Sequence, residues 1–402
     1  MNVLFAWELG SNFGHLAQQL PIALALRARG HHIQFAVRNT AAARKILGPH
    51  NFLYVQAPYS IERPRLHTSP ANYAEILLAE GFHDPHALLG RVDAWRNLFD
   101  LAQTEALLVD HAPTALLAGM LADIPRVALG NGFALPPNLS PYPFFRSWET
   151  PSAARLAKSQ QLVLDHINAV GRTSRHEPLQ HLHEIFSGSA KALITIPELD
   201  HYGARPEERY LGPIHAQLGG EKVVWPEGQG KHILAYLRPD VPGFHALIQV
   251  LKARTNPTLV VAPNAPQKWI EQIAVKNVAV YPGPIQVEPL LAECELGISY
   301  GGSGTLSQFA LSGIPQLVLP KNVEQYLGAI RVAQLGAGIV IEKARAEKDL
   351  APAVDQILND ERFPYASCEF AKRYAQFSPA QPVAEVVQLV EQKPSSVSAG
   401  GG

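Results

Sequence analysis

A glycine-rich stretch, Tyr300-Gly301-Gly302-Ser303-Gly304-Thr305, has the residue types of an anion-binding turn. It follows the apolar run 296–299, which predicts a buried strand, and precedes 306–311, which predicts a helix. Glycines let the backbone approach a ligand closely, and the first N–H groups of a helix are unpaired and carry partial positive charge. The pattern therefore predicts a phosphate-binding turn, although a tight connection without a ligand has the same appearance. It lacks the lysine of nucleoside-triphosphate loops and the spacing of dinucleotide loops.

A histidine and an aspartate stand at the ends of two predicted strands in the first half. His15 opens a helix after the strand 3–6, and Asp110 follows the strand 106–109. A histidine titrates near neutrality and can take a proton from a hydroxyl, and a carboxylate can orient its ring. His15 is thus a candidate general base, Asp110 its candidate partner and His111 a rival base. The alternatives are a plain helix-start residue for His15 and a helix N-cap for Asp110.

Apolar runs alternate with helical patterns along the chain, which predicts an α/β protein with two doubly wound parallel sheets. The expected strands are 3–6, 33–37, 52–55, 106–109 and 126–129 in the first half, and 232–236, 258–262, 278–281, 296–299, 316–319 and 338–341 in the second. Ligands of such sheets bind at the carboxyl ends of the strands, so two domains facing across a cleft can each hold one substrate. We expect domains at 1–212 and 231–378, a linker at 213–230, a helix at 379–392 that packs on the first domain, and a disordered tail at 393–402.

Composition excludes several classes of partner. The chain has 402 residues, a net charge of −1 and only 17% charged residues, so no basic field favours nucleic acid. The two cysteines, Cys294 and Cys368, indicate no disulfide framework. The N-terminus lacks the basic region of a signal peptide, and no long apolar run predicts a membrane span. We expect a cytoplasmic protein, a monomer or homodimer, with peripheral membrane contact at most.

The segment 130–151 is rich in proline and aromatic residues, which predicts a long irregular loop. Such a loop either contacts an apolar or aromatic acceptor or packs on its own domain. The candidate acceptor-binding residues are Phe13, Phe133, Phe144 and Trp148. The pairs His83/His86 and His181/His183 have no further ligands at metal-site spacing, so we expect no metal site.

Two groups of motifs carry a resemblance to a known family. They are Gly14-His15, Pro21 and 26–31 in the first half, and 300–305, Gly313-Ile314-Pro315, Pro320, Glu324-Gln325 and 335–338 in the second. In order and spacing they resemble GT-B nucleotide-sugar glycosyltransferases of the bacterial UDP-glycosyltransferase type. The match covers the first forty residues and roughly 285–340.

The resemblance implies a metal-independent, inverting transfer of a sugar from a UDP- or dTDP-sugar to a hydroxyl of a small-molecule or lipid-like acceptor. It implies His15 as the base and Asp110 as the residue that orients it, with no cofactor beyond the nucleotide sugar. The donor-binding residues that it implies are Ser11, Gly14, Arg238, Val287, Tyr300, Gly301, Gly302, Ser303, Gly304, Thr305, Glu324 and Gln325.

The chain departs from the family pattern at the donor site. Tyr300 stands where the family usually has a histidine that contacts phosphate, and Pro284 stands where many members have a base-stacking tryptophan, which Tyr281 can replace. Two alternatives therefore stay open. One is a catalytically inactive GT-B auxiliary protein that binds and activates a transferase. The other is a GT-B nucleotide-sugar 2-epimerase, whose opening loop usually has Arg and Glu in place of Gly14-His15.

Overall fold

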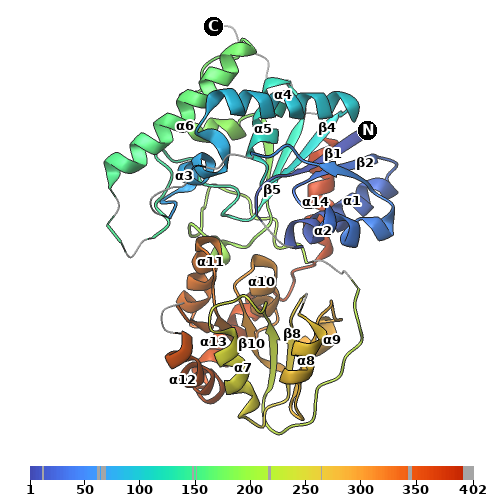
Figure 1. Cartoon of the computed structure of the whole chain (residues 1–402), viewed down its shortest axis with the longest axis vertical. Helices are drawn as coiled ribbons and strands as arrows, with labels where there is room; N and C mark the ends of the chain where they lie inside the picture. The colour runs from blue at the N-terminus through green and yellow to red at the C-terminus, as the bar shows by residue number, and fades with distance from the viewer. Residues whose placement is uncertain are drawn as a thin grey trace. The chain divides into compact units, whose positions relative to one another are not determined.

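The computed structural model of the chain describes residues 1–10, 13–60, 64, 69–146, 149–150, 152–215, 219–263, 265–342 and 346–392. The chain forms two compact units (Figure 1). Unit 1 comprises Met1–Thr195, Arg205–Ala216 and Pro379–Gly402, and unit 2 comprises Ile196–Ala204 and Gln217–Ser378.

Unit 1 has a six-stranded parallel sheet in the order β3-β2-β1-β4-β5-β6. Its strands are β1 (Asn2–Trp7), β2 (His32–Val37), β3 (Leu53–Gln56), β4 (Ala106–Asp110), β5 (Arg126–Gly130) and β6 (Ser189–Leu193). Its α-helices are α1 (Gly14–Ala28), α2 (Thr40–Ile46), α3 (Tyr73–Leu77), α4 (Pro85–Leu101), α5 (Pro113–Leu121), α6 (Ala153–Thr173) and α14 (Ala380–Glu391). Short helical turns are η1 (Gly48–His50), η2 (Leu78–Phe82) and η3 (Leu182–Phe186).

The two faces of this sheet are covered by different helices. Alternate residues of β1, such as Phe5 and Trp7, pack with α1, α2 and α14 in one apolar cluster. On the other face α5 comes close to β4, because Gly119 leaves room for the side chain of Leu107. The last helix, α14, lies beside α1 (Figure 1), and its Val386 and Val387 are buried in the same cluster.

Unit 2 repeats the architecture with a second six-stranded parallel sheet in the order β12-β11-β10-β7-β8-β9. Its strands are β7 (His232–Tyr236), β8 (Thr258–Val261), β9 (Val278–Tyr281), β10 (Cys294–Ser299), β11 (Gln316–Val318) and β12 (Gly338–Val340). Its helices are η4 (Pro197–Leu199), α7 (Phe244–Lys252), α8 (Gln267–Ile273), α9 (Glu288–Leu291), α10 (Ser303–Leu311), α11 (Val323–Gln334), α12 (Ala346–Asn359) and α13 (Arg362–Arg373). The prediction of two doubly wound parallel sheets is confirmed.

One strand and one stretch of chain add to the expected pattern. The edge strand β6 has the sequence Ser-Ala-Lys-Ala-Leu, which is too mixed to predict a strand. Part of the segment expected as a linker pairs with unit 2, where the N–H of Glu221 donates to the carbonyl of Pro284 at 3.0 Å. Trp225 then stacks on His232 with ring centroids 4.5 Å apart. These contacts attach the stretch that precedes β7 to unit 2.

Candidate active site

His15 and Asp110 are in direct contact. β1 and β4 are neighbours and pair Trp7 with Asp110, so the loop that leads from β1 to His15 starts beside the end of β4. His15 Nδ1 lies 2.9 Å from Asp110 Oδ1. An ionised carboxylate only accepts hydrogen bonds, so Nδ1 carries the proton and donates it, which leaves the lone pair on Nε2. The side chain of His15 is 20% exposed and that of Asp110 only 2%. His15 is therefore a candidate base with a partly exposed side chain, hydrogen-bonded to a buried carboxylate.

Two residues that sequence reasoning missed fix the ring of His15. Trp7 stacks on it, with centroids 5.3 Å apart and planes 27° from parallel, and Trp7 Nε1 donates to the carbonyl of Leu9 at 2.6 Å. Gly10 lies close to the Nε2 edge of the ring, because a Cβ built there would come within 2.3 Å of His15 Nε2. Gly10 also has φ +89°, which favours glycine. Stacking and close backbone approach thus leave the imidazole little freedom to rotate.

The charges around the pair keep Asp110 ionised. Burial by itself raises the pKa of this carboxyl, but the charge and hydrogen bond of His15, together with a 2.8 Å hydrogen bond from Gln19 Nε2, hold it below its usual value. The rival base, His111, is buried. Burial, aided by the charge of His15, lowers the pKa of His111 to about 3, so His111 is neutral at physiological pH. A histidine with so low a pKa is a weak base, which favours His15 over His111.

The alternative role of Asp110, as a helix N-cap, belongs to another residue. Helix α5 has no capping side chain at its N-cap position, Ala112. The carboxyl of Glu8 instead accepts from the N–H groups of Thr114 at 3.0 Å and Ala115 at 2.7 Å. Burial raises the pKa of Glu8 to about 7, although these two hydrogen bonds oppose the change. Asp110 is therefore left for His15.

A cavity of about 270 Å³ lies at the carboxyl ends of β1, β2 and β3. Its lining residues are Trp7, Gly10, Arg38, Asn39, Thr40, Ala41 and Gln56. Two of these residues, Trp7 and Gly10, also contact the imidazole of His15. Arg38 lines the cavity and is steadied by a 2.6 Å hydrogen bond from Nη1 to the carbonyl of Glu8.

The candidate acceptor-binding residues have different surroundings. Phe133 is buried next to the pair, edge-on to His111 at 6.2 Å and stacked on Phe145 at 5.2 Å. Phe13 packs partly on the core of unit 1, with the ammonium of Lys45 5.5 Å from its ring. Phe144 lies under the guanidinium of Arg146 at 4.9 Å. Trp148 and the candidate donor-binding residue Ser11 lie outside the described residues.

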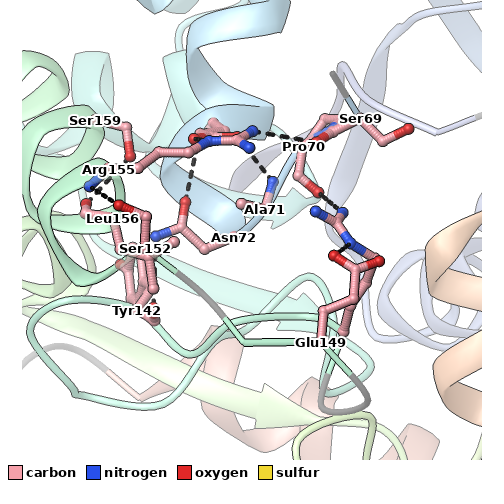
Figure 2. A network of polar contacts seen from close by, with 12 residues as sticks. Ser69, Pro70, Ala71, Asn72, Tyr142, Glu149, Ser152, Arg155, Leu156 and Ser159 are labelled. Atoms are coloured by element: carbon pink, nitrogen blue, oxygen red, sulfur yellow. Dashed lines mark hydrogen bonds and ion pairs between the residues drawn. The ribbon is translucent and has the colours of Figure 1, made fainter.

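A polar network holds the proline-rich loop in place (Figure 2). Arg155 of α6 donates to both carboxylate oxygens of Glu75, at 2.7 and 2.6 Å, and Glu75 in turn accepts from the N–H of Ala71 at 2.8 Å. The carbonyl of Ala71 accepts from the N–H of Phe145 at 2.8 Å. The loop that carries Phe133 and Phe145 is thereby attached to α3 and α6, and much of its aromatic content packs on unit 1.

In unit 2 the glycine-rich turn joins β10 to α10. Gly301 has φ +89°, its N–H donates to the hydroxyl of Ser299 at 3.1 Å, and Gly302 occupies the N-cap position without a capping side chain. A Cβ built at Gly304 meets no atom within 4 Å, so the first turn of α10 has open space beside it. A helix N-terminus of this kind can bind an anion through its N–H groups.

Tyr300, the departure from the family pattern, packs partly against the core of unit 2. Its ring centroid is 6.2 Å from that of Tyr236, and a Cβ built at Gly302 would lie 3.4 Å from the Tyr300 ring. Burial raises the pKa of Tyr300 above its usual value, so the hydroxyl is neutral. The Tyr300 ring therefore packs between the core of unit 2 and Gly302 of the turn.

The other candidate donor-binding residues of unit 2 have different surroundings. The charges of Arg238 and Glu324 act on the pKa of Tyr300 in opposite directions, Arg238 lowering it and Glu324 raising it. Arg238 Nε lies 3.2 Å from Asp240 Oδ1. Gln325 is buried, with Oε1 accepting from the N–H of Lys321 at 2.9 Å. Val287 precedes the short helix α9 and belongs to a separate apolar cluster with Ile285.

The described residues contain neither a membrane-spanning helix nor a cluster of metal-binding side chains. No helix among them is long and apolar enough to cross a membrane. Within the same residues, no three histidine, cysteine or acidic side chains form a group that could hold a metal ion.

Comparisons with known proteins confirm the predicted resemblance to GT-B nucleotide-sugar glycosyltransferases. Residues 267–392 match the family model "Erythromycin biosynthesis protein CIII-like, C-terminal domain". Over 92% of this chain and 88% of the relative, the sequence is 24% identical to a PGL/p-HBAD biosynthesis glycosyltransferase of Mycobacterium tuberculosis (strain ATCC 25177 / H37Ra).

Solved structures show the same fold over nearly the whole chain. Spinosyn Rhamnosyltransferase SpnG matches with a TM-score of 0.68 at 19% identity, covering 98% of this chain and 100% of that one. The glycosyltransferase SnogD from Streptomyces nogalater matches with a TM-score of 0.66 at 18% identity, covering 97% and 100%.

Proposed function

We propose that the chain transfers a sugar from a UDP- or dTDP-sugar to a hydroxyl of a small-molecule acceptor, with inversion at the anomeric carbon. The observation that carries the proposal is the contact between His15 and the buried Asp110, with Nε2 left as the basic nitrogen. Similar structures support the substrate classes: SpnG was solved with thymidine diphosphate and with spinosyn aglycone, and VinC with DTDP.

In the proposed reaction, His15 Nε2 takes the proton from the acceptor hydroxyl as its oxygen attacks the anomeric carbon. Asp110 stabilises the imidazolium that forms and keeps the proton of the neutral ring on Nδ1. The nucleoside diphosphate departs from the opposite side of the sugar. One displacement of this kind inverts the anomeric centre, because His15 activates the acceptor and forms no bond to the sugar.

The leaving diphosphate requires stabilisation of its negative charge. We propose that the N–H groups of 301–305 at the start of α10 supply it, with the hydroxyls of Ser303 and Thr305 and the cation of Arg238. Glu324 and Gln325 would bind sugar hydroxyls, and the backbone near Val287 would bind the nucleobase. The donors in this set do not depend on a divalent metal ion.

The test is a transfer assay over UDP- and dTDP-sugars with a panel of hydroxylated small molecules. It measures nucleoside diphosphate release and, by NMR, the anomeric configuration of the product. We expect one donor class to support transfer with inversion, without inhibition by a chelator. We expect His15→Ala to lower kcat by about 100-fold or more while donor affinity stays nearly intact.

Other outcomes would point elsewhere. Wild-type kcat in His15→Ala would remove His15 from the mechanism, and inhibition by a chelator that Mg²⁺ reverses would contradict a metal-independent site. Nucleotide binding without hydrolysis or transfer of any donor would favour a catalytically inactive binding protein. The observation that favours this second candidate is Tyr300, whose ring packs against the core and carries no charge that could stabilise a diphosphate.

A further inference from the structure

Asp110 receives two hydrogen bonds from one face of α1. His15 and Gln19 are four residues apart, so on a helix they lie one above the other on the same side. His15 Nδ1 donates to Asp110 Oδ1 at 2.9 Å, and Gln19 Nε2 donates to Asp110 Oδ2 at 2.8 Å. Each carboxylate oxygen therefore has its own donor from α1.

Gln19 is wholly buried, with 0% of its surface exposed. Its amide nitrogen must face Asp110, because an amide oxygen at 2.8 Å from a carboxylate oxygen would be repelled. Among the described residues, Oε1 of Gln19 has no hydrogen-bond partner. A buried oxygen without a partner costs free energy, so an apolar side chain would suit the core position better. Packing alone does not explain a glutamine here.

We propose that Gln19 is a positioning residue of the transfer reaction: its amide fixes the rotation of the Asp110 carboxylate, so that Oδ1 stays directed at His15 Nδ1. The inference rests on the proposed function and deepens it by adding a third residue to the pair. A carboxylate held at one oxygen only can rotate away from the imidazole. The hydrogen bond that keeps the proton of His15 on Nδ1 would then be lost.

The charged state of Asp110 agrees with this role. The titratable groups that face Asp110 are His15 from α1 and His111 from the loop after β4. Burial raises the pKa of Asp110, whereas the charges of these two histidines and the hydrogen bonds from His15 and Gln19 lower it. Gln19 thus favours the ionised carboxylate that an imidazolium needs as its partner.

The experiment compares Gln19→Met, Gln19→Glu and a matched control, Gln18→Met, with the wild type in the transfer assay. Methionine has nearly the length of glutamine and no donor. Gln18 is the neighbouring, half-buried residue on α1 and lies outside the site. We expect Gln19→Met to lower kcat about tenfold, since it removes one hydrogen bond to a charged group, with KM for both substrates within about twofold. Gln18→Met should keep wild-type kcat and melting temperature.

The pH profile separates positioning from packing. In Gln19→Glu the new carboxyl can donate to Asp110 only while it is protonated, and two carboxyls this close share a proton. We expect the ratio of its kcat to that of the wild type to be highest at low pH and to fall as the pH rises. The corresponding ratio for Gln19→Met should stay flat. If Gln19 only packs, the kcat of both variants should fall only as far as their melting temperatures fall at the same pH.

Two results would overturn the proposal. One is a Gln19→Met variant with kcat within twofold of the wild type. The other is a loss of activity in both variants that follows only their melting temperatures, at every pH. These outcomes differ from failure of the proposed function, which would show as an absence of transfer by the wild type or as full activity of His15→Ala.

Discussion

At the scale of single residues, the reactivity of His15 depends on what surrounds its two nitrogens. Nδ1 is paired with Asp110, and Nε2 lies against Gly10. The sequence indicated His15 and Asp110 because each follows a predicted strand. It did not indicate Gly10 or Trp7, because nothing in their local pattern shows that they contact the histidine ring.

The positive φ of Gly10 gives Gly10→Ala a folding cost of about 1–3 kcal/mol. Melting temperatures of Gly10→Ala and of a control, Gly90→Ala, check this. Gly90 lies on α4, and a Cβ there meets no atom within 4 Å. A melting temperature of Gly10→Ala equal to that of the wild type would contradict this cost.

At the scale of elements, the proposed diphosphate site consists of β10, the turn and α10 together. Gly297 in β10 leaves room for Phe309 of α10, since a Cβ there would come within 2.5 Å of the Phe309 ring. Gly301 bends the chain, with the carbonyl of Gln325 only 3.0 Å from where its Cβ would be. These are local requirements, so the sequence pattern predicted the strand, turn and helix correctly. The mixed sequence of β6 gave no such pattern, because its strand forms by pairing with β5.

Gly301→Ala and Gly304→Ala should have opposite effects on stability. The first forces a side chain into positive φ and against Gln325, at a cost of about 1–3 kcal/mol. The second replaces a helical glycine in open space, which stabilises by about 0.5–1 kcal/mol.

Calorimetric titration with UDP and dTDP then separates folding from binding. We expect Gly304→Ala to weaken diphosphate binding severalfold although the protein melts higher, because the methyl group occupies the space beside the N–H groups. Unchanged affinity in Gly304→Ala would mean that the diphosphate does not approach α10 at this position.

At the scale of the whole molecule, both ends of the chain build unit 1. Helix α14 returns after unit 2 and buries Val386, Val387 and Val390 in the cluster that contains β1 and α1. Its last residue, Glu391, accepts two hydrogen bonds from Arg29 at 2.7 Å and lies 2.9 Å from His31. The helix that contains His15 thus packs against α14, so the core of unit 1 includes residues from both sides of unit 2 in the sequence.

Val387→Asp should destabilise unit 1 by about 3 kcal/mol or more, because it buries an unpaired charge. Ala384→Asp, at an exposed position of the same helix, should change stability by less than about 0.5 kcal/mol. Hydrogen exchange measured segment by segment should show loss of protection in unit 1 of Val387→Asp, with nucleotide binding retained by unit 2. Equal losses in both units would show that they unfold as one.

The sequence by itself determined the two parallel sheets, the glycine-rich turn and the positions of His15 and Asp110 after their strands. These follow from apolar periodicity and from residue preferences that act over a few neighbouring positions. Only the tertiary structure decided which side chains surround those two residues. Gln19 and Asp110 are 91 positions apart, and Glu8, which caps α5 and leaves Asp110 for His15, lies 106 positions before Thr114. Contacts at such separations depend on which strands become neighbours and which face each helix buries, and no local pattern contains that information.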